Sequence, residues 1–169
     1  MLKPEQPVPN LAFDLTDGSC WSFDAAAPRT LTMLAIYRGA FCRFCRRHLL
    51  DLEAMAPAFA ERGVDIIAVS ADSADTARTM ARDLGLERVR VGHGVDLALL
   101  SQSGVFLSEV TRDGAVLRFA EPSLWLVRPD RRLYAIFQGS MSCARPDLAS
   151  LLDGVDMLAP HGFPPRGNG

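Results

Sequence analysis

The sequence lacks several features that would place it in a large class of proteins. None of its apolar runs approaches the roughly 20 residues that a membrane-spanning helix needs. Its 18 basic and 20 acidic residues leave a formal charge of −2, so nothing attracts it to nucleic acid or to anionic lipid. No internal repeat is apparent. We therefore expect neither nucleic acid nor a membrane among its partners.

Cysteine is also scarce. Four cysteines are too few to hold a chain of 169 residues together through disulfides. Residues 1–10 are polar and proline-rich, and they lack the basic start and apolar centre of a secretory signal. A reducing cytoplasm is therefore the expected location. In that compartment a close pair of cysteines is more often catalytic or metal-binding than structural.

Apolar runs and helical periodicities alternate along the chain. The predicted elements are a hairpin (11–15 and 20–23), buried strands (31–37 and 64–70), helices (46–62 and 73–84), a second hairpin (124–127 and 132–137) and a last helix opened by Arg145 and Pro146. This order predicts an α/β fold with a central mixed β-sheet flanked by helices and an N-terminal β-hairpin extension. We expect one domain at 11–158, preceded by an extended arm at 1–10 and followed by a flexible tail at 159–169.

The most informative motif is the Cys-x-x-Cys pair at residues 42–45, between the buried strand and the first helix. A helix N-terminus offers unpaired N–H groups and the positive end of the helix dipole, and both stabilise a thiolate. The same junction carries four arginines that add positive charge: Arg38, Arg43, Arg46 and Arg47. Such surroundings lower a thiol pKa from about 8.5 toward roughly 3.5–7.5. The motif therefore predicts thiol redox catalysis by Cys42 and Cys45.

His48 leaves a second interpretation open, because it extends the motif to Cys-x-x-Cys-x-x-His. Cys42, Cys45 and His48 could serve a non-enzymatic metal-binding or metallochaperone module. Zinc sites usually combine two paired ligand clusters, and the sequence offers only one. The redox interpretation needs neither a metal nor an organic cofactor.

Three segments, residues 37–45, 67–73 and 121–127, carry a resemblance to a known family. They resemble the peroxiredoxin-like branch of the alkyl hydroperoxide reductase and thiol-specific antioxidant (AhpC/TSA) family, within the thioredoxin fold. The similarity runs from about residue 9 to about residue 158. It implies a thioredoxin-like fold and an antioxidant oxidoreductase. It also implies that Pro122 is cis and packs beside the cysteine pair, and it makes Arg118 the candidate for the family's second activating arginine.

The resemblance leaves the roles of the two cysteines open. Typical peroxiredoxins carry Pro-x-x-x-Thr-x-x-Cys at this junction. Aligned with that pattern, Arg38 stands at the proline, Cys42 at the threonine and Cys45 at the peroxidatic cysteine. In the thioredoxin pattern, by contrast, Cys42 attacks and Cys45 resolves. The absence of the threonine hydroxyl counts against direct peroxidase activity.

The expected partners follow from the same resemblance. The pair would cycle between dithiol and disulfide and reduce a hydroperoxide or a protein disulfide. A thioredoxin- or glutathione-type reductant would restore the dithiol. Members of the family often dimerise, so a homodimer is one candidate assembly.

Overall fold

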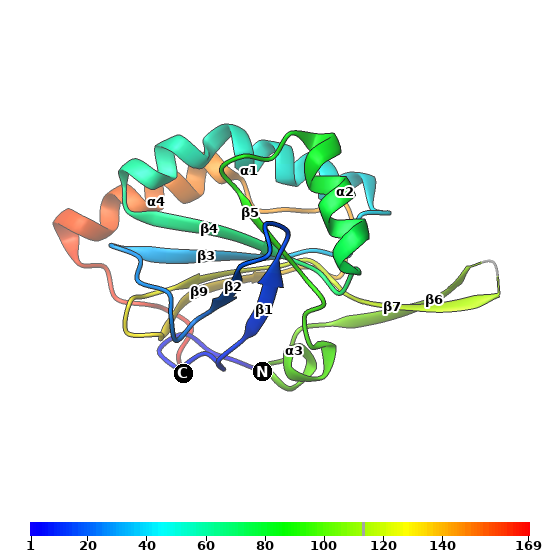
Figure 1. The fold of residues 1–169 in the computed structure, drawn as a ribbon. Coiled ribbons are helices and arrows are strands. Elements are labelled where there is room, and N and C mark those ends of the chain that lie inside the picture. The colour runs from blue at the N-terminus through cyan, green and yellow to red at the C-terminus, as the bar shows by residue number, and fades with distance from the viewer. Residues whose placement is uncertain (113) are drawn as a thin grey trace.

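The chain folds around a seven-stranded mixed β-sheet, as the computed structural model shows (Figure 1). The structure describes residues 1–112 and 114–169, apart from the side chains of residues 112 and 159–161. The strands of the sheet, in their spatial order, are β2 (Cys20–Ser22), β1 (Ala12–Leu15), β5 (Arg90–His93), β4 (Val64–Val69), β3 (Leu31–Ile36), β8 (Ser123–Val127) and β9 (Leu133–Gln138). A separate hairpin comprises β6 (Leu107–Arg112) and β7 (Ala115–Ala120).

Helices cover both faces of the sheet. They are α1 (Arg43–Glu61), α2 (Ala74–Leu84), α3 (Leu97–Gln102) and α4 (Leu148–His161). Three of them, α1, α2 and α4, lie along one face, whereas α3 lies on the other side with both chain termini (Figure 1). The predicted mixed sheet flanked by helices is confirmed.

Strand β3 shows how the sheet separates two apolar cores. All six of its residues are buried, and side chains along a strand alternate between the faces. Met33 and Ala35 pack into the core beneath α1, α2 and α4. Leu34 and Ile36 pack into a second core, which includes the N-terminal hairpin and α3. A strand buried on both faces reads as a continuous apolar run, which is why the sequence identified it.

Helix α1 positions the cysteine pair at its N-terminus. Its buried stripe has the predicted spacing of three and four, with Leu49, Leu52, Ala56 and Phe59 facing the sheet. Pro57 lies inside this helix, where a proline usually kinks the helix or ends its regular part. The helix instead continues to Glu61, because the buried residues on either side of Pro57 keep it packed on the core.

The two ends of the expected domain differ in detail from the prediction. The N-terminal hairpin belongs to the main sheet, because β1 pairs with β5 as well as with β2. The last helix begins at Leu148 rather than at Arg145. Its N-cap is Asp147, whose carboxylate accepts a hydrogen bond from the Ser150 N–H at 2.8 Å. Helix α4 extends to His161, three residues past the expected domain end.

The hairpin β6–β7 was not predicted. It projects from the body of the molecule beside α3 (Figure 1). Its strands pair over six residues each, yet Val110 and Val116 are largely exposed. Because few of its apolar side chains are buried, the period of two that marks a half-buried strand is weak here.

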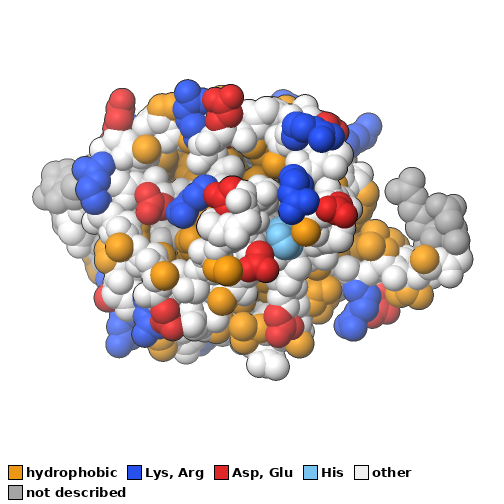
Figure 2. Space-filling model, viewed as in Figure 1, with side chains coloured by type: hydrophobic (Ala, Val, Ile, Leu, Met, Phe, Trp, Pro, Cys, Tyr) orange, Lys and Arg blue, Asp and Glu red, His pale blue; other side chains and the backbone are white. Residues whose placement is uncertain are grey.

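The surface carries charges of both signs. Acidic and basic side chains are interspersed on the face shown in Figure 2, without a patch of one sign. Within the described part of the chain, no helix has the length and apolar character to cross a membrane.

Candidate functional site

The loop that leads from β3 into α1 is held in one conformation by Asp72, in the segment after β4. The Asp72 carboxylate accepts hydrogen bonds from the Ala40 N–H at 2.8 Å and from the Ser70 hydroxyl at 2.9 Å. Gly39 has φ of 145°, and a Cβ there would lie 2.9 Å from Asp72 Oδ1. Glycine is therefore required both for the backbone conformation and for the close approach. This loop sets the position of Cys42.

Cys42 is the N-cap residue of α1. Its Sγ accepts a hydrogen bond from the backbone N–H of Cys45 at 3.3 Å, as a capping oxygen would. Its side chain is buried, with 4% of its surface exposed. The predicted placement of the pair at a helix N-terminus is therefore observed, with the sulfur of Cys42 at the positive end of the helix dipole.

The two thiols are shifted in opposite directions. Burial alone would raise the pKa of Cys42. Hydrogen bonds from the Cys45 thiol and backbone N–H, together with Arg38, outweigh burial and lower that pKa below the usual thiol value. Burial and the hydrogen bond to Cys42 together raise the pKa of Cys45 to about 11, against the nearby charge of Arg145. The geometry therefore favours a thiolate at Cys42 with Cys45 as its protonated donor.

Arg38 is the arginine of the predicted cluster that acts on the pair. Its Nε lies 3.4 Å from Glu121 Oε2, and its guanidinium lies 4.6 Å from the ring centroid of Phe119. The ring of Phe41, which packs edge-to-face on Phe119, lies 5.6 Å from the same guanidinium. These contacts hold the positive charge beside Cys42, where it lowers the pKa of that thiol.

The other predicted arginines lie elsewhere. The guanidinium of Arg43 stacks over the ring of its neighbour Phe44 at 4.7 Å. Arg46 lines a shallow surface depression with Asp75 and Thr76 at the start of α2. Arg47 is exposed. Of the expected cluster, Arg38 is therefore the member that acts on the sulfur of Cys42.

Arg145 is a residue of the site that the sequence did not reveal as such. Its Nη2 donates to Cys45 Sγ at 3.2 Å, from the loop before α4. Arg118, the candidate for a second activating arginine, instead pairs with Glu109 at 2.6 Å on the β6–β7 hairpin and is largely exposed. That assignment was wrong. It rested on closeness in sequence to Pro122, whereas the contact to Cys45 comes from 100 residues along the chain.

Pro122 corrects a second expectation. The Glu121–Pro122 bond is trans, not cis. The Pro122 carbonyl accepts a hydrogen bond from the Gly139 N–H at 3.0 Å, and β8 begins at the next residue. Pro122 therefore continues the chain from β7 into β8 in extended geometry, which a trans proline adopts without strain.

His48 is buried in α1. Burial lowers its pKa to about 4, and the charge of Arg145 contributes in the same direction. No three His, Cys, Asp or Glu side chains within the described residues are placed to hold a metal ion. Cys42, Cys45 and His48 therefore do not form the ligand set of the metal-binding alternative.

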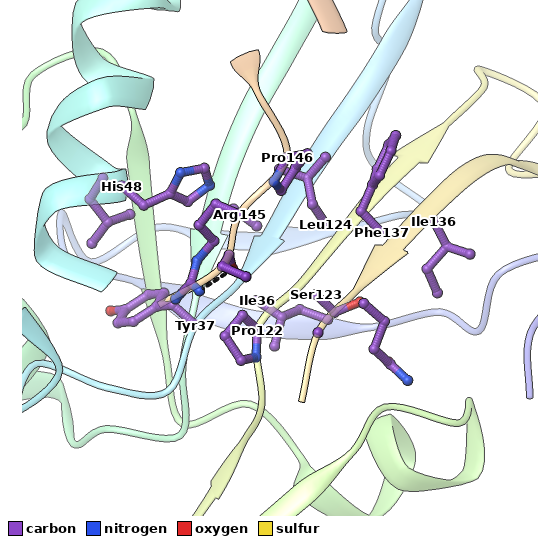
Figure 3. A pocket seen from close by; sticks show the side chains of 15 residues that line it. Ile36, Tyr37, His48, Pro122, Ser123, Leu124, Ile136, Phe137, Arg145 and Pro146 are labelled. Atoms are coloured by element: carbon purple, nitrogen blue, oxygen red, sulfur yellow. Dashed lines mark hydrogen bonds between the residues drawn. The ribbon is translucent and has the colours of Figure 1, made fainter. Parts of the chain in front are cut away.

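Two further features border the site. Arg145 and His48 also line a pocket of about 400 Å³, into which apolar side chains of β8 and β9 project (Figure 3). Cys143 is exposed on the loop before Arg145, whereas Cys20 lies on β2 and donates to Asp14 at 2.9 Å. Both of these thiols are free.

A sequence model of the AhpC/TSA family matches residues 4–136. The same sequence has no significant match among curated proteins.

Solved structures with the same fold are peroxiredoxins. Peroxidoxin BcpB from Mycobacterium tuberculosis superposes with a TM-score of 0.76 at 14% identity, covering 94% of this chain and 99% of that one. Peroxiredoxin 6 of Arenicola marina superposes with a TM-score of 0.79 at 16% identity, covering 98% of this chain and 81% of that one. Peroxiredoxin Q of Xanthomonas campestris superposes with a TM-score of 0.66 at 22% identity, covering 90% of this chain and 92% of that one. At these identities the likeness shows a shared fold, which confirms the thioredoxin-like prediction.

Proposed function

The chain belongs to the AhpC/TSA family of thiol-dependent antioxidant oxidoreductases, and we propose that it reduces hydroperoxides by cycling Cys42 and Cys45 between dithiol and disulfide. Cys42 is the nucleophile and Cys45 the resolving thiol. The whole reaction is assigned to one domain, residues 11–158. The observation that carries this assignment is the cap geometry, in which the Cys42 Sγ accepts the Cys45 N–H at the start of α1. This contact helps to lower the pKa of Cys42, whereas burial raises that of Cys45.

The first step oxidises Cys42. Its thiolate attacks the distal oxygen of the hydroperoxide, a sulfur–oxygen bond forms, and the oxygen–oxygen bond breaks. The leaving oxygen takes a proton from water and departs as an alcohol. Arg38, held by Glu121 and Phe119, places a positive charge where the leaving oxygen becomes negative.

The second step closes the disulfide. Cys45 loses its proton and attacks the sulfur of the Cys42 sulfenic acid, which releases water. The charge of Arg145 favours the thiolate that this step needs, against the burial that opposes it. A thioredoxin-type dithiol, or two monothiols of the glutathione type, then supplies two electrons and two protons and becomes a disulfide. The cytoplasmic location and a homodimer remain predictions of the sequence.

A protein disulfide is a second candidate substrate. A Cys-x-x-Cys pair at the start of a helix, with a lowered pKa at the outer thiol, suits thiol–disulfide exchange as well. Cys42 would then form a mixed disulfide with the substrate, and Cys45 would release it.

The exchanged roles form a competing mechanism, favoured by the hydrogen bond from Arg145 to Cys45. In it Cys45 attacks the peroxide and Cys42 resolves. The raised pKa of Cys45 opposes this version, because that thiol ionises less readily than Cys42.

Trapping the oxidised intermediate tests the proposal. The reduced Cys45→Ser and Cys42→Ser variants are each mixed with one equivalent of tert-butyl hydroperoxide and dimedone, which labels sulfenic acids. Mass spectrometry then locates the label. We expect it on Cys42 in Cys45→Ser and no label on Cys45 in Cys42→Ser. A label on Cys45 alone would establish the exchanged roles. If the protein consumes peroxide no faster than a free thiol does, the hydroperoxide is ruled out as substrate and the protein disulfide remains as the candidate.

A further inference from the structure

The pocket beside the cysteine pair has the size and walls of a small-molecule site. Its volume of about 400 Å³ lies within the roughly 300–1,000 Å³ of such sites. Figure 3 shows Leu124, Ile136 and Phe137 on its β8 and β9 side, with Arg145 and His48 on the other. The walls are mostly apolar, so an occupant with a hydrocarbon body would bury its surface there.

The pocket carries charge of one sign. Arg145 is its charged residue at neutral pH, because burial lowers the pKa of His48 to about 4 and keeps that imidazole neutral. All of its lining residues lie in the described part of the chain, and they include no Asp or Glu. An apolar cavity with a single fixed cation is complementary to a molecule with a single negative charge.

The guanidinium of Arg145 has hydrogens left for such a molecule. Its Nη1 donates to the carbonyl oxygens of Ser142 at 3.1 Å and Ala144 at 2.6 Å, and its Nη2 donates to Cys45 Sγ. A guanidinium has five N–H hydrogens, so the Nε–H and one Nη2 hydrogen remain. Arg145 forms no ion pair with any described carboxylate. The two remaining hydrogens are on adjacent nitrogens, which matches the two oxygens of a carboxylate.

We propose that this pocket binds a medium-chain monocarboxylate, with its carboxylate on Arg145 and its hydrocarbon chain against Leu124, Ile136 and Phe137. The ligand is a bound effector and not the oxidant, since binding needs no peroxide group.

Occupation of the pocket would also reach Cys45 through the shared arginine. A carboxylate on Arg145 offsets the positive charge that favours the Cys45 thiolate. The ligand should therefore slow disulfide closure without slowing the attack by Cys42. This second effect rests on the proposed function, whereas binding itself does not.

Calorimetric titration of the reduced full-length protein tests the binding. Octanoate is compared with three probes: octanol with the same chain and no charge, octylammonium with the opposite charge, and acetate with the head group alone. We expect octanoate to bind at least about tenfold more tightly than octanol, as one charge-assisted hydrogen-bond pair allows. Octylammonium and acetate should give no measurable heat.

Matched variants locate the site. Arg145→Gln should weaken octanoate by about tenfold and leave octanol within about twofold. Arg47→Gln removes an exposed charge next to His48 that does not line the pocket, and it should leave both ligands unchanged. Phe137→Thr keeps a strand-forming residue on β9 and should weaken octanoate and octanol together.

Several results would overturn the proposal. Equal affinities for octanoate and octanol, or equal losses in Arg47→Gln and Arg145→Gln, would remove the carboxylate site. No binding of octanoate, together with a concentration-dependent dimer in light scattering, would assign this face to a second copy of the chain. If octanoate binds as expected but the cysteines show no turnover, the site stands and the proposed function fails.

Discussion

The surroundings of Cys42 and Cys45 differ more than their separation by three residues suggests. Cys42 caps the helix and receives hydrogen bonds, so its pKa is lowered. Cys45 lies inside the first turn, donates to Cys42 and is more deeply buried, so its pKa is raised. The positive end of a helix therefore does not activate every thiol near it. It activates Cys42, whose sulfur accepts a hydrogen bond from a backbone N–H of the helix, while the Cys45 thiol donates its own hydrogen to that sulfur.

Removal of either thiol should have the largest effect on peroxide consumption, and the two removals should differ in which phase they abolish. Cys42→Ser should lower the second-order rate of peroxide consumption by more than about 10³-fold, because it removes the nucleophile. Cys45→Ser should keep the first turnover and lose sustained turnover with a dithiol reductant. Stopped-flow and steady-state peroxide assays measure the two phases.

Cys20→Ser is the control for these variants, because its thiol lies on β2 and bonds to Asp14. It should retain both phases. Loss of the first turnover in Cys45→Ser rather than in Cys42→Ser would reverse the assignment.

The burial of His48, one turn along α1 from Cys45, can be tested through the pH dependence of the free energy of unfolding. The pKa of His48 is about 4 when folded against a usual 6.5, so between these pH values the unfolded chain holds a proton that the folded chain lacks. The free energy of unfolding should therefore be fully retained above pH 6.5. As pH falls from about 6.5 to 4 it should drop by up to about 3 kcal/mol. Urea unfolding at pH 7 and pH 4.5 measures this loss.

His48→Leu should reduce that pH dependence, whereas His93→Gln at the end of β5 should keep it. Equal slopes in His48→Leu and the unmodified protein would show that His48 is not the residue responsible.

The lowered pKa of Cys42 depends in part on the charge of Arg38. Arg38→Gln removes a charge-assisted hydrogen bond of about 1.5–3 kcal/mol, which is about one to two pKa units at Cys42. Alkylation of Cys42 at pH 7 should then slow by about tenfold. Arg43→Gln is the matched control, since its guanidinium lies over Phe44, and it should change the rate by less than about twofold. Equal slowing by Arg38→Gln and Arg43→Gln would show that the overall positive charge near the helix lowers the pKa of Cys42, and not the specific contact with Arg38.

Arg145→Gln should give the smallest of these effects, on Cys45 alone. Loss of the charge beside Cys45 raises the pKa of that thiol further, so disulfide closure should slow by about three- to tenfold. Rapid acid quench and mass spectrometry follow closure after one equivalent of peroxide. A slower first step in this variant would instead support Cys45 as the nucleophile.

Local patterns in the sequence predicted much of the fold and half of the site. The buried run of β3, the stripe of α1 and the start of α2 after Ser73 are set by neighbouring residues, and each was found where predicted. The position of the cysteine pair followed from the same junction.

The remaining features depend on contacts between distant parts of the chain. Arg145 reaches Cys45 across 100 residues, and Glu121 fixes Arg38 from the end of the β6–β7 hairpin. Nothing in the local sequence distinguishes Arg145 from an exposed arginine such as Arg118. The resemblance also carried over a cis proline that this chain does not have at Pro122.

The pKa values of Cys42 and Cys45 in one reduced sample test the central claim most directly. Alkylation is followed from pH 5 to pH 11, and mass spectrometry of the peptides separates the two residues. Cys42 should become reactive below the usual thiol pKa, and Cys45 only near pH 11. A lower pKa at Cys45 than at Cys42 would contradict the account.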